Sequence, residues 1–377
     1  MLISFLCFSQ QETKLSLLTF EPGTEAYSIF GHTAIRVYNP FEETDLVYNF
    51  GMFDFDAPNF LLKFSGGRLD YKLGIEDFTP TLQAYSYDKR QVWEQLLNFN
   101  EAQTKEIVEK LEYLYRPENR YYRYGFLQRN CSTEIRDLLL ETVEGVEYSP
   151  TETGSTYRDY INDYAKVTPW FRFGINLALG SPIDYEINTY ELMFLPDFLS
   201  REMEKTKVNG KPVAEPQEKL LGTFEKENAS KWQLTPFIIF CIVFVILVLG
   251  RSRFLIQTFT ICVGIGGLII LALMLFSAHA EVQNNYNLLW CNPLYFVSFV
   301  LCFTDKIKFH KIFAAIMLLG VLATFAVWIL KIQGFDWAFL PICLTLIWIN
   351  IKQMQRKYKM KEVEVEKENA NEYEKYN

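Results

Sequence analysis

The segment Phe30-Gly31-His32-Thr33-Ala34-Ile35-Arg36-Val37 contains a strand pattern that begins directly after a glycine. Short runs of β-branched or aromatic residues between turn residues are typical of strands, and this run predicts one at residues 33–38. Similar runs predict strands at residues 14–20, 45–50 and 69–73. Apolar residues recur at helical spacing after Asn100, and again from Cys131 to Gly145. Strands followed by helices predict an α+β domain.

His32 is the only histidine in residues 1–233. A single histidine at a strand edge is more often structural than catalytic. Cys131 follows Asn130 and opens a predicted helix over residues 132–142, where the helix dipole lowers the pKa of a thiol. By itself this cysteine is best read as a small buried residue. Together, the two residues predict a papain-like nucleophile and base, in an order that a circular permutation would give.

A cysteine–histidine pair needs a third polar residue to orient the imidazole. Asn49 lies on the next predicted strand and is our first candidate, with Tyr48 and Asp45 as competitors. Backbone N–H groups at the start of the helix, those of Cys131 and a neighbour, are the expected oxyanion donors. We place Asn130, Ser132 and Tyr48 around that site.

Two further features near the pair have two interpretations each. Arg36 shares the strand face of His32, so it either binds a substrate phosphate or forms a salt bridge. Tyr121, Tyr122 and Tyr124 precede the cysteine and either contact acyl chains or fill the core.

The second half of the chain is almost continuously apolar and predicts a helical membrane domain of about five spans. The predicted segments are 234–250, 254–276, 288–303, 312–330 and 335–351. Basic residues cluster at 251–253, 306–311 and 352–361. The positive-inside rule makes these clusters and the C-terminal tail cytoplasmic, so the first domain faces outward.

The loop at residues 278–293 carries many polar side chains beside predicted spans. One interpretation is an interfacial loop that Tyr286 and Trp290 anchor. The other is the mouth of a polar cavity, because polar residues at membrane depth are often functional. In the second case His279 and Asn287 are candidate substrate-binding residues.

Composition limits the classes of protein that fit. The chain has 377 residues, a net charge of −8, and 50% hydrophobic and 16% aromatic residues. Disordered chains are poor in such residues, and nucleic-acid proteins show a basic face, so both classes are excluded and we expect no nucleic-acid partner. Once residues 1–10 are removed, the first domain offers one histidine and one cysteine, which are too few for a zinc site. Nucleotide-binding signatures are absent, so we expect no metal and no cofactor.

These observations predict five regions. Residues 1–10 are similar to a truncated signal peptide without a basic start, and Cys7 lies within it. The catalytic domain follows at 11–205, a hairpin and linker at 206–233, the membrane domain at 234–351 and the tail at 352–377.

Five motifs in order carry a resemblance to a known family. They are residues 31–36, 48–55, 58–60, 67–71 and 130–133. Over about residues 14–200 the chain resembles the periplasmic domain of the Lnb-type lipoprotein N-acyltransferases of Bacteroidota. The early histidine and the Asn-Cys element are also similar to the permuted papain-like group that includes lecithin:retinol acyltransferase.

The resemblance implies a bacterial inner-membrane enzyme with a periplasmic catalytic domain. It implies transfer of an acyl chain from a phospholipid donor to the N-terminal amine of a diacylated lipoprotein, and it assigns the catalytic pair to Cys131 and His32. The same pair also suits a hydrolase, such as a phospholipase, thioesterase or cell-wall endopeptidase. A membrane adaptor without catalytic activity is a further alternative.

Overall fold

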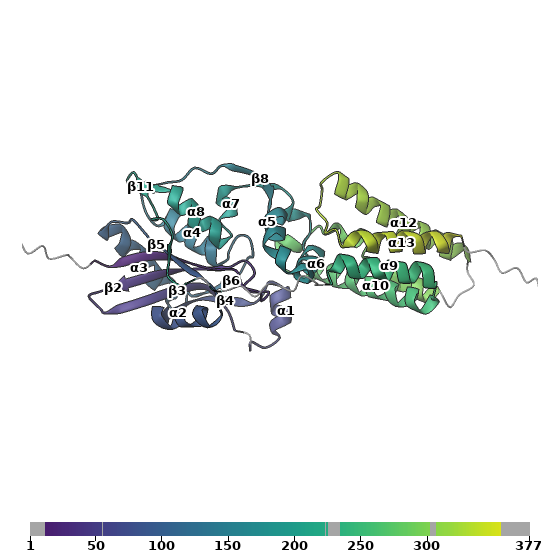
Figure 1. The fold of residues 1–377 in the computed structure, drawn as a ribbon, viewed down its shortest axis with the longest axis horizontal. Coiled ribbons are helices and arrows are strands. Elements are labelled where there is room, and N and C mark those ends of the chain that lie inside the picture. The colour runs from purple at the N-terminus through teal and green to yellow at the C-terminus, as the bar shows by residue number, and fades with distance from the viewer. Residues whose placement is uncertain (1–11, 55, 223, 225–233, 302–306, 356–377) are drawn as a thin grey trace, which may run out of the picture. The chain divides into compact units, whose positions relative to one another are not determined.

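The computed structural model describes residues 12–54, 56–222, 224, 234–301 and 307–355 (Figure 1). The chain forms two compact units. The first covers Met1–Ile175, Pro182–Gln233 and Leu273–Gln283, and the second covers Asn176–Ser181, Leu234–Ala272 and Asn284–Asn377. The predicted signal segment and residues 356–377 of the predicted tail lie outside the described residues.

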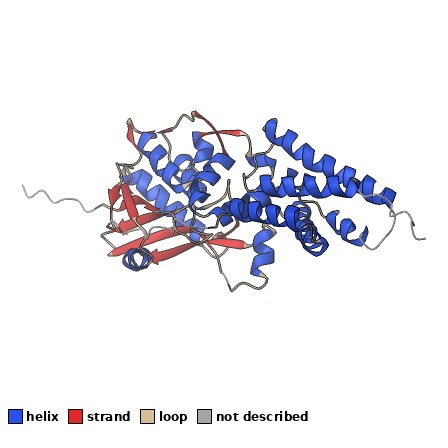
Figure 2. Cartoon of the chain, turned by 45° about the vertical axis from the view of Figure 1, so that its right-hand side comes forward, coloured by secondary structure: helices blue, strands red, loops and turns tan. Residues whose placement is uncertain are grey.

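The centre of the first unit is a seven-stranded antiparallel sheet, drawn in red in Figure 2. Its strand order is β12-β5-β1-β2-β3-β4-β6. The bounds are β1 Lys14–Phe20, β2 His32–Asn39, β3 Thr44–Met52, β4 Asp70–Asp77, β5 Val92–Leu96, β6 Tyr121–Arg123 and β12 Glu218–Lys219. The four strands predicted from sequence are present, and β5, β6 and β12 are additions.

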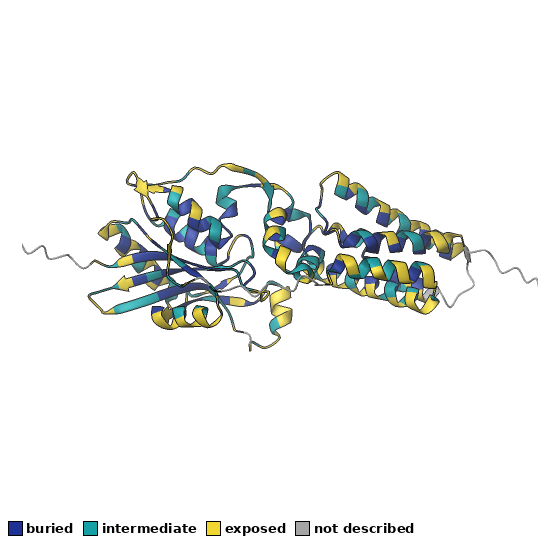
Figure 3. Cartoon of the chain, in the orientation of Figure 1, coloured by how far each residue is buried: buried dark blue, intermediate teal, exposed yellow. Residues whose placement is uncertain are grey.

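Helices cover both faces of this sheet (Figure 1). On one face, α3 (Glu101–Tyr115), α4 (Cys131–Glu141) and α8 (Pro196–Lys205) bury the main apolar cluster against β1–β4. On the other face, α2 (Phe78–Tyr87) packs Phe78 against Phe20, Ala34 and Val47. Because both faces of the sheet are covered, its central strands are largely buried, as the dark blue in Figure 3 shows.

The remaining elements of the first unit are short. They are α1 (Phe60–Ser65), α5 (Tyr157–Tyr164), α6 (Pro169–Ala178, which enters the second unit), α7 (Thr189–Leu192), β7 (Val146–Glu147), β8 (Glu152–Thr156), β9 (Glu186–Asn188), β10 (Lys207–Val208) and β11 (Lys211–Pro212). Asn209 and Gly210, both at positive φ, form the predicted hairpin turn between β10 and β11. The hairpin is therefore present, and because it and β12 pair with strands of the first unit, residues 207–219 extend that unit.

The second unit is helical. Its apolar helices are α9 (Pro236–Gly250), α10 (Arg253–Phe276, whose last turn belongs to the first unit), α11 (Tyr295–Leu301), α12 (Ile307–Ile329) and α13 (Phe339–Met354). In the described residues, α10 and the Lys308–Ile329 part of α12 are long and apolar enough to cross a membrane. The third predicted segment is not one helix, because residues 286–289 form a separate 3-10 turn before α11.

Candidate active site

Asn130 fixes the start of α4 and thereby the position of Cys131. Its side-chain Oδ1 accepts from the backbone N–H groups of Ser132 (2.8 Å) and Thr133 (3.0 Å). Its Nδ2 donates to the carbonyls of Phe126 (2.8 Å) and Phe194 (2.9 Å). Such N-caps satisfy N–H groups that the helix leaves unpaired. Cys131 is therefore held at the first position of a rigid helix and stays partly exposed.

The cap also corrects one expectation about the oxyanion donors. The Ser132 N–H is bonded to Asn130, so it is not available to a substrate. The Cys131 N–H has no such bond to the cap, and it lies at the helix terminus, where N–H groups are free to bind anions.

His32 begins β2 at the end of the sheet, next to Gly31, which has a φ of 78°. A side chain at Gly31 would place its Cβ 2.9 Å from the carbonyl oxygen of Phe20, so this turn requires glycine. The Phe20 ring stacks on the imidazole at a centroid distance of 5.6 Å. The backbone and this ring together hold the imidazole in place.

Asn49 and Glu76 extend a hydrogen-bonded chain from His32. The imidazole Nε2 lies 3.1 Å from Asn49 Oδ1, and Asn49 Nδ2 donates to Glu76 Oε2 at 2.6 Å. The carboxylate accepts only, so it fixes the amide with Oδ1 toward His32. His32 Nε2 then carries the proton, which leaves Nδ1 as the acceptor for the thiol proton. Asn49 is thus placed as the sequence predicts, whereas Glu76 was missed.

The electrostatics of the pair favour its charged form. Burial by itself would lower the pKa of His32, but the charge of Cys131 and hydrogen bonds to Cys131 and Asn49 raise that pKa above its ordinary value. Burial would raise the pKa of Cys131, but His32, the Thr33 backbone and Ser132 lower that pKa. A thiolate beside an imidazolium is the arrangement that cysteine nucleophiles use.

Gly51 and Tyr122 lie beside Cys131. A Cβ at Gly51 would stand 3.7 Å from the Cys131 Cβ and 3.9 Å from Tyr122 Oη. The Tyr122 side chain is buried, its hydroxyl oxygen faces the Gly51 backbone N–H, and no acceptor for the hydroxyl proton lies among the described residues. A buried hydroxyl proton without an acceptor is costly, so its position next to a nucleophile points to a donor that awaits a substrate oxygen.

Three other predicted residues have structural contacts. Arg36 binds Asp45 (Nε–Oδ1, 2.7 Å) and Glu94 (Nη1–Oε1, 2.8 Å), and its guanidinium lies over the Phe78 ring. The salt-bridge interpretation of Arg36 therefore fits, and Asp45 is not the residue that orients His32. Arg36 lines a cavity of about 470 Å³ to which neither His32 nor Cys131 contributes. Tyr48 is buried in the main apolar cluster. Its side chain points to the sheet face opposite to that of Asn49, so Tyr48 does not orient His32.

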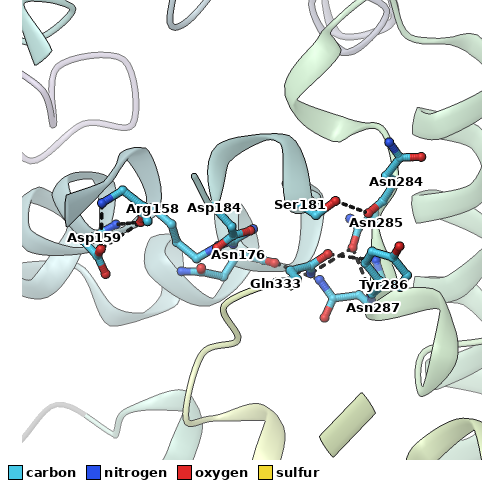
Figure 4. Close-up of polar contacts among 11 residues, drawn as sticks. Arg158, Asp159, Asn176, Ser181, Asp184, Asn284, Asn285, Tyr286, Asn287 and Gln333 are labelled. Carbon is cyan, nitrogen blue, oxygen red and sulfur yellow. Dashed lines mark hydrogen bonds and ion pairs between the residues drawn. The ribbon is translucent and has the colours of Figure 1, made fainter. Parts of the chain in front are cut away.

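The two candidates in the loop at 278–293 lie in different units. The ring Nε2 of His279 lies 3.0 Å from the carbonyl oxygen of Phe64, within the first unit. Asn287 is fully buried in the second unit, where it donates to the Asn176 carbonyl at 2.9 Å (Figure 4). It also accepts from Trp290 Nε1 at 2.9 Å. These bonds give Asn287 the contacts of a structural residue rather than those of a substrate ligand.

No group of three or more His, Cys, Asp or Glu side chains forms a possible metal site in the part of the chain that the structure describes. Cys131, His32, Asn49, Glu76 and Tyr122 are the polar groups that the first unit brings together at this site.

Family comparisons match both halves of the chain. The Lnb N-terminal periplasmic domain matches residues 8–166, and the Lnb transmembrane domain matches residues 226–361. The second match supports membrane association of the helical half. No curated protein and no solved structure matches the chain in these comparisons.

Proposed function

Because the chain belongs to the Lnb family, we propose that it is a lipoprotein N-acyltransferase with a cysteine nucleophile. The acyl donor is a phospholipid, and the acceptor is the N-terminal amine of a diacylglyceryl-cysteine lipoprotein. The observation that carries the proposal is the placement of Cys131 at the start of α4 beside His32, whose imidazole is oriented by Asn49 and Glu76. Such a pair keeps a thiolate ready to attack an ester carbonyl.

In the first step, the Cys131 thiolate attacks the carbonyl carbon of a phospholipid ester, and the carbonyl oxygen takes up the negative charge. The tetrahedral intermediate then collapses: the carbonyl double bond forms again, the carbon–oxygen bond to glycerol breaks, and the new sulfur–carbon bond remains. The His32 imidazolium gives its proton to the departing alkoxide. The products are an acyl thioester on Cys131, a neutral His32 and a lysophospholipid.

In the second step, the lipoprotein amine attacks the thioester carbon. Neutral His32 takes the amine proton, the carbon–nitrogen bond forms and the Cys131 thiolate leaves. The amide product departs, and the thiolate–imidazolium pair is restored. Asn49 and Glu76 keep the imidazole in the tautomer that both steps require.

Both steps create a negative oxygen that needs hydrogen-bond donors. The Cys131 N–H at the helix start and the unpartnered Tyr122 O–H are the two donors that we assign to it. One preorganised donor of this kind changes kcat by about 10²- to 10³-fold. Tyr122 therefore acts as a catalytic residue by touching the reacting oxygen.

The helical half is, in this proposal, a multi-pass domain of about five spans in the inner membrane. The basic clusters flanking its apolar helices support a cytoplasmic C-terminus and a periplasmic catalytic unit. Phospholipid donors and lipoprotein acceptors both lie in that membrane, so the catalytic unit meets both at its surface.

The proposal is tested by mass spectrometry of a diacylated lipopeptide incubated with phospholipid vesicles and the purified full-length protein. We expect the lipopeptide to gain one amide-linked acyl chain, and Cys131→Ala to abolish the gain. Free fatty acid without modified peptide would instead establish a hydrolase. A folded wild-type protein that changes neither lipid nor peptide would favour the adaptor.

A further inference from the structure

Helix α1 is apolar and almost wholly exposed. Four of its six residues are Phe60, Leu61, Leu62 and Phe64, and none of the six is buried. Leu61 is 73% exposed, Leu62 is 75% exposed and Phe64 is 48% exposed. Figure 3 shows the helix in yellow. A contiguous apolar surface of this kind marks a binding surface for a protein or a membrane.

The contacts of α1 within the first unit indicate which of these it meets. The Ser277 hydroxyl donates to the Ser65 carbonyl at 2.7 Å, and the Ala278 N–H donates to the Gly66 carbonyl at 3.0 Å. A Cβ at Gly67 would lie 3.2 Å from the His279 backbone nitrogen, so glycine permits this close approach. Segment 277–279 is therefore hydrogen-bonded to, and packed against, the C-terminal end of α1.

Ser277 directly follows Phe276, the last residue of α10. α10 has 24 residues and is apolar enough to cross a membrane. Its final residues, Leu275 and Phe276, are exposed like those of α1. A spanning helix ends where hydrocarbon gives way to head groups, so the segment bonded to α1 lies at that boundary.

We propose that α1 is a lipid-docking helix, which inserts Leu61, Leu62 and Phe64 into the periplasmic leaflet of the bilayer. Short apolar surfaces at the interface gain stability by burying side chains at the head-group and acyl boundary. Lys63 lies between the inserting residues and extends its ammonium group toward the head groups. The occupant of this surface is phospholipid.

Aromatic rings connect α1 with the neighbourhood of Cys131. Ring centroids are separated by 6.0 Å from Phe64 to Phe60, 5.8 Å from Phe60 to Phe53, 5.1 Å from Phe53 to Tyr71 and 4.3 Å from Tyr71 to Tyr124. Tyr124 and Cys131 both pack against the main apolar cluster, so Tyr124 is the inner end of this row. We infer that an acyl chain follows the surface of this row of rings from the leaflet toward the nucleophile. That route rests on the proposed function, whereas the docking does not.

Photocrosslinking tests the docking without any enzymatic step. The full-length protein carries p-benzoylphenylalanine at position 62, or at position 87 as the control, and is reconstituted in vesicles of phosphatidylethanolamine and phosphatidylglycerol. Tyr87 ends α2 and is 89% exposed, so it matches position 62 in exposure. We expect phospholipid adducts from position 62 and none from position 87. Equal adducts at both positions, or adducts of position 62 with protein alone, would overturn the proposal.

A kinetic experiment tests the route. Leu61→Asn combined with Leu62→Asn should lower kcat/KM for vesicle phospholipid about 100-fold, because two leucine side chains lose their burial. Phe41→Asn, at a 74% exposed position in the turn before β3, should leave it unchanged. Iodoacetamide labelling of Cys131 checks that the double variant keeps its site. If position 62 forms lipid adducts but the wild type transfers no acyl chain, the docking proposal stands and the proposed function is refuted. A double variant with wild-type kcat/KM would overturn the route.

Discussion

Replacement of Glu76 by alanine should slow the reaction at the site without changing the residues Cys131 and His32. The carboxylate accepts from Asn49 Nδ2 at 2.6 Å and so keeps Asn49 Oδ1 on His32 Nε2. Without it, the buried amide is free to turn its donor toward the imidazole. The proton then moves to Nδ1, and His32 no longer accepts the thiol proton.

The size of the effect follows from the bond that is lost. A hydrogen bond to a charged group contributes about 1.5–3 kcal/mol. Glu76 is exposed to solvent, so we take the lower end, which corresponds to about a tenfold loss in kcat/KM. Glu76→Gln keeps an acceptor but not the charge, and charge-assisted bonds are roughly twice as strong as neutral ones. That variant should therefore lose less than Glu76→Ala.

The assay is the pH dependence of Cys131 alkylation by iodoacetamide, followed by mass spectrometry of the cysteine peptide. Glu76→Ala should move the thiol pKa upward, so that alkylation slows more in acid than in base. The matched control is Glu94→Gln, which removes a carboxylate of the same sheet that binds Arg36 at 2.8 Å instead of Asn49. A wild-type profile for Glu76→Ala, or an equal shift for Glu94→Gln, would refute the reasoning.

Four further predictions concern neighbouring groups. Tyr122→Phe should lower kcat by about 10²-fold through loss of an oxyanion donor, and an unchanged rate of Cys131 alkylation would locate the defect in the transition state. Asn130→Ala removes the cap of α4 and should lower the free energy of unfolding by about 1–2 kcal/mol, measured by thermal denaturation. Gly67→Ala should also destabilise, because φ is +63° and the Cβ meets segment 277–279, whereas Gly174→Ala, with nothing within 4 Å, should not. Acyl transfer should depend on pH as a bell whose acid limb follows the lowered pKa of Cys131 and whose alkaline limb follows the raised pKa of His32, and a thiol that titrates at its ordinary pKa would contradict this.

Local sequence was sufficient for several features of this protein. The Asn130-Cys131 helix start, the Asn100 capping box and the Asn209-Gly210 turn depend on neighbours within four residues, so their side chains and backbone preferences predict them. The two helices long enough to cross a membrane follow from apolar length alone.

Strand register decided what the sequence left open. The pairing of β3 with β4 sets Val47 opposite Glu76 and Asn49 opposite Gly74, so the carboxylate lies diagonal to the amide that it binds. Residues 27 positions apart have no local pattern that predicts such a bond. Tertiary contacts also decide the roles of two other candidates. Arg36 forms salt bridges with Asp45 and Glu94, and Asn287 is fully buried. Helix α1 is a further example. Its apolar residues stay exposed, and its C-terminal end is bonded to the segment that follows α10. Only the folded chain determines which apolar surfaces are covered.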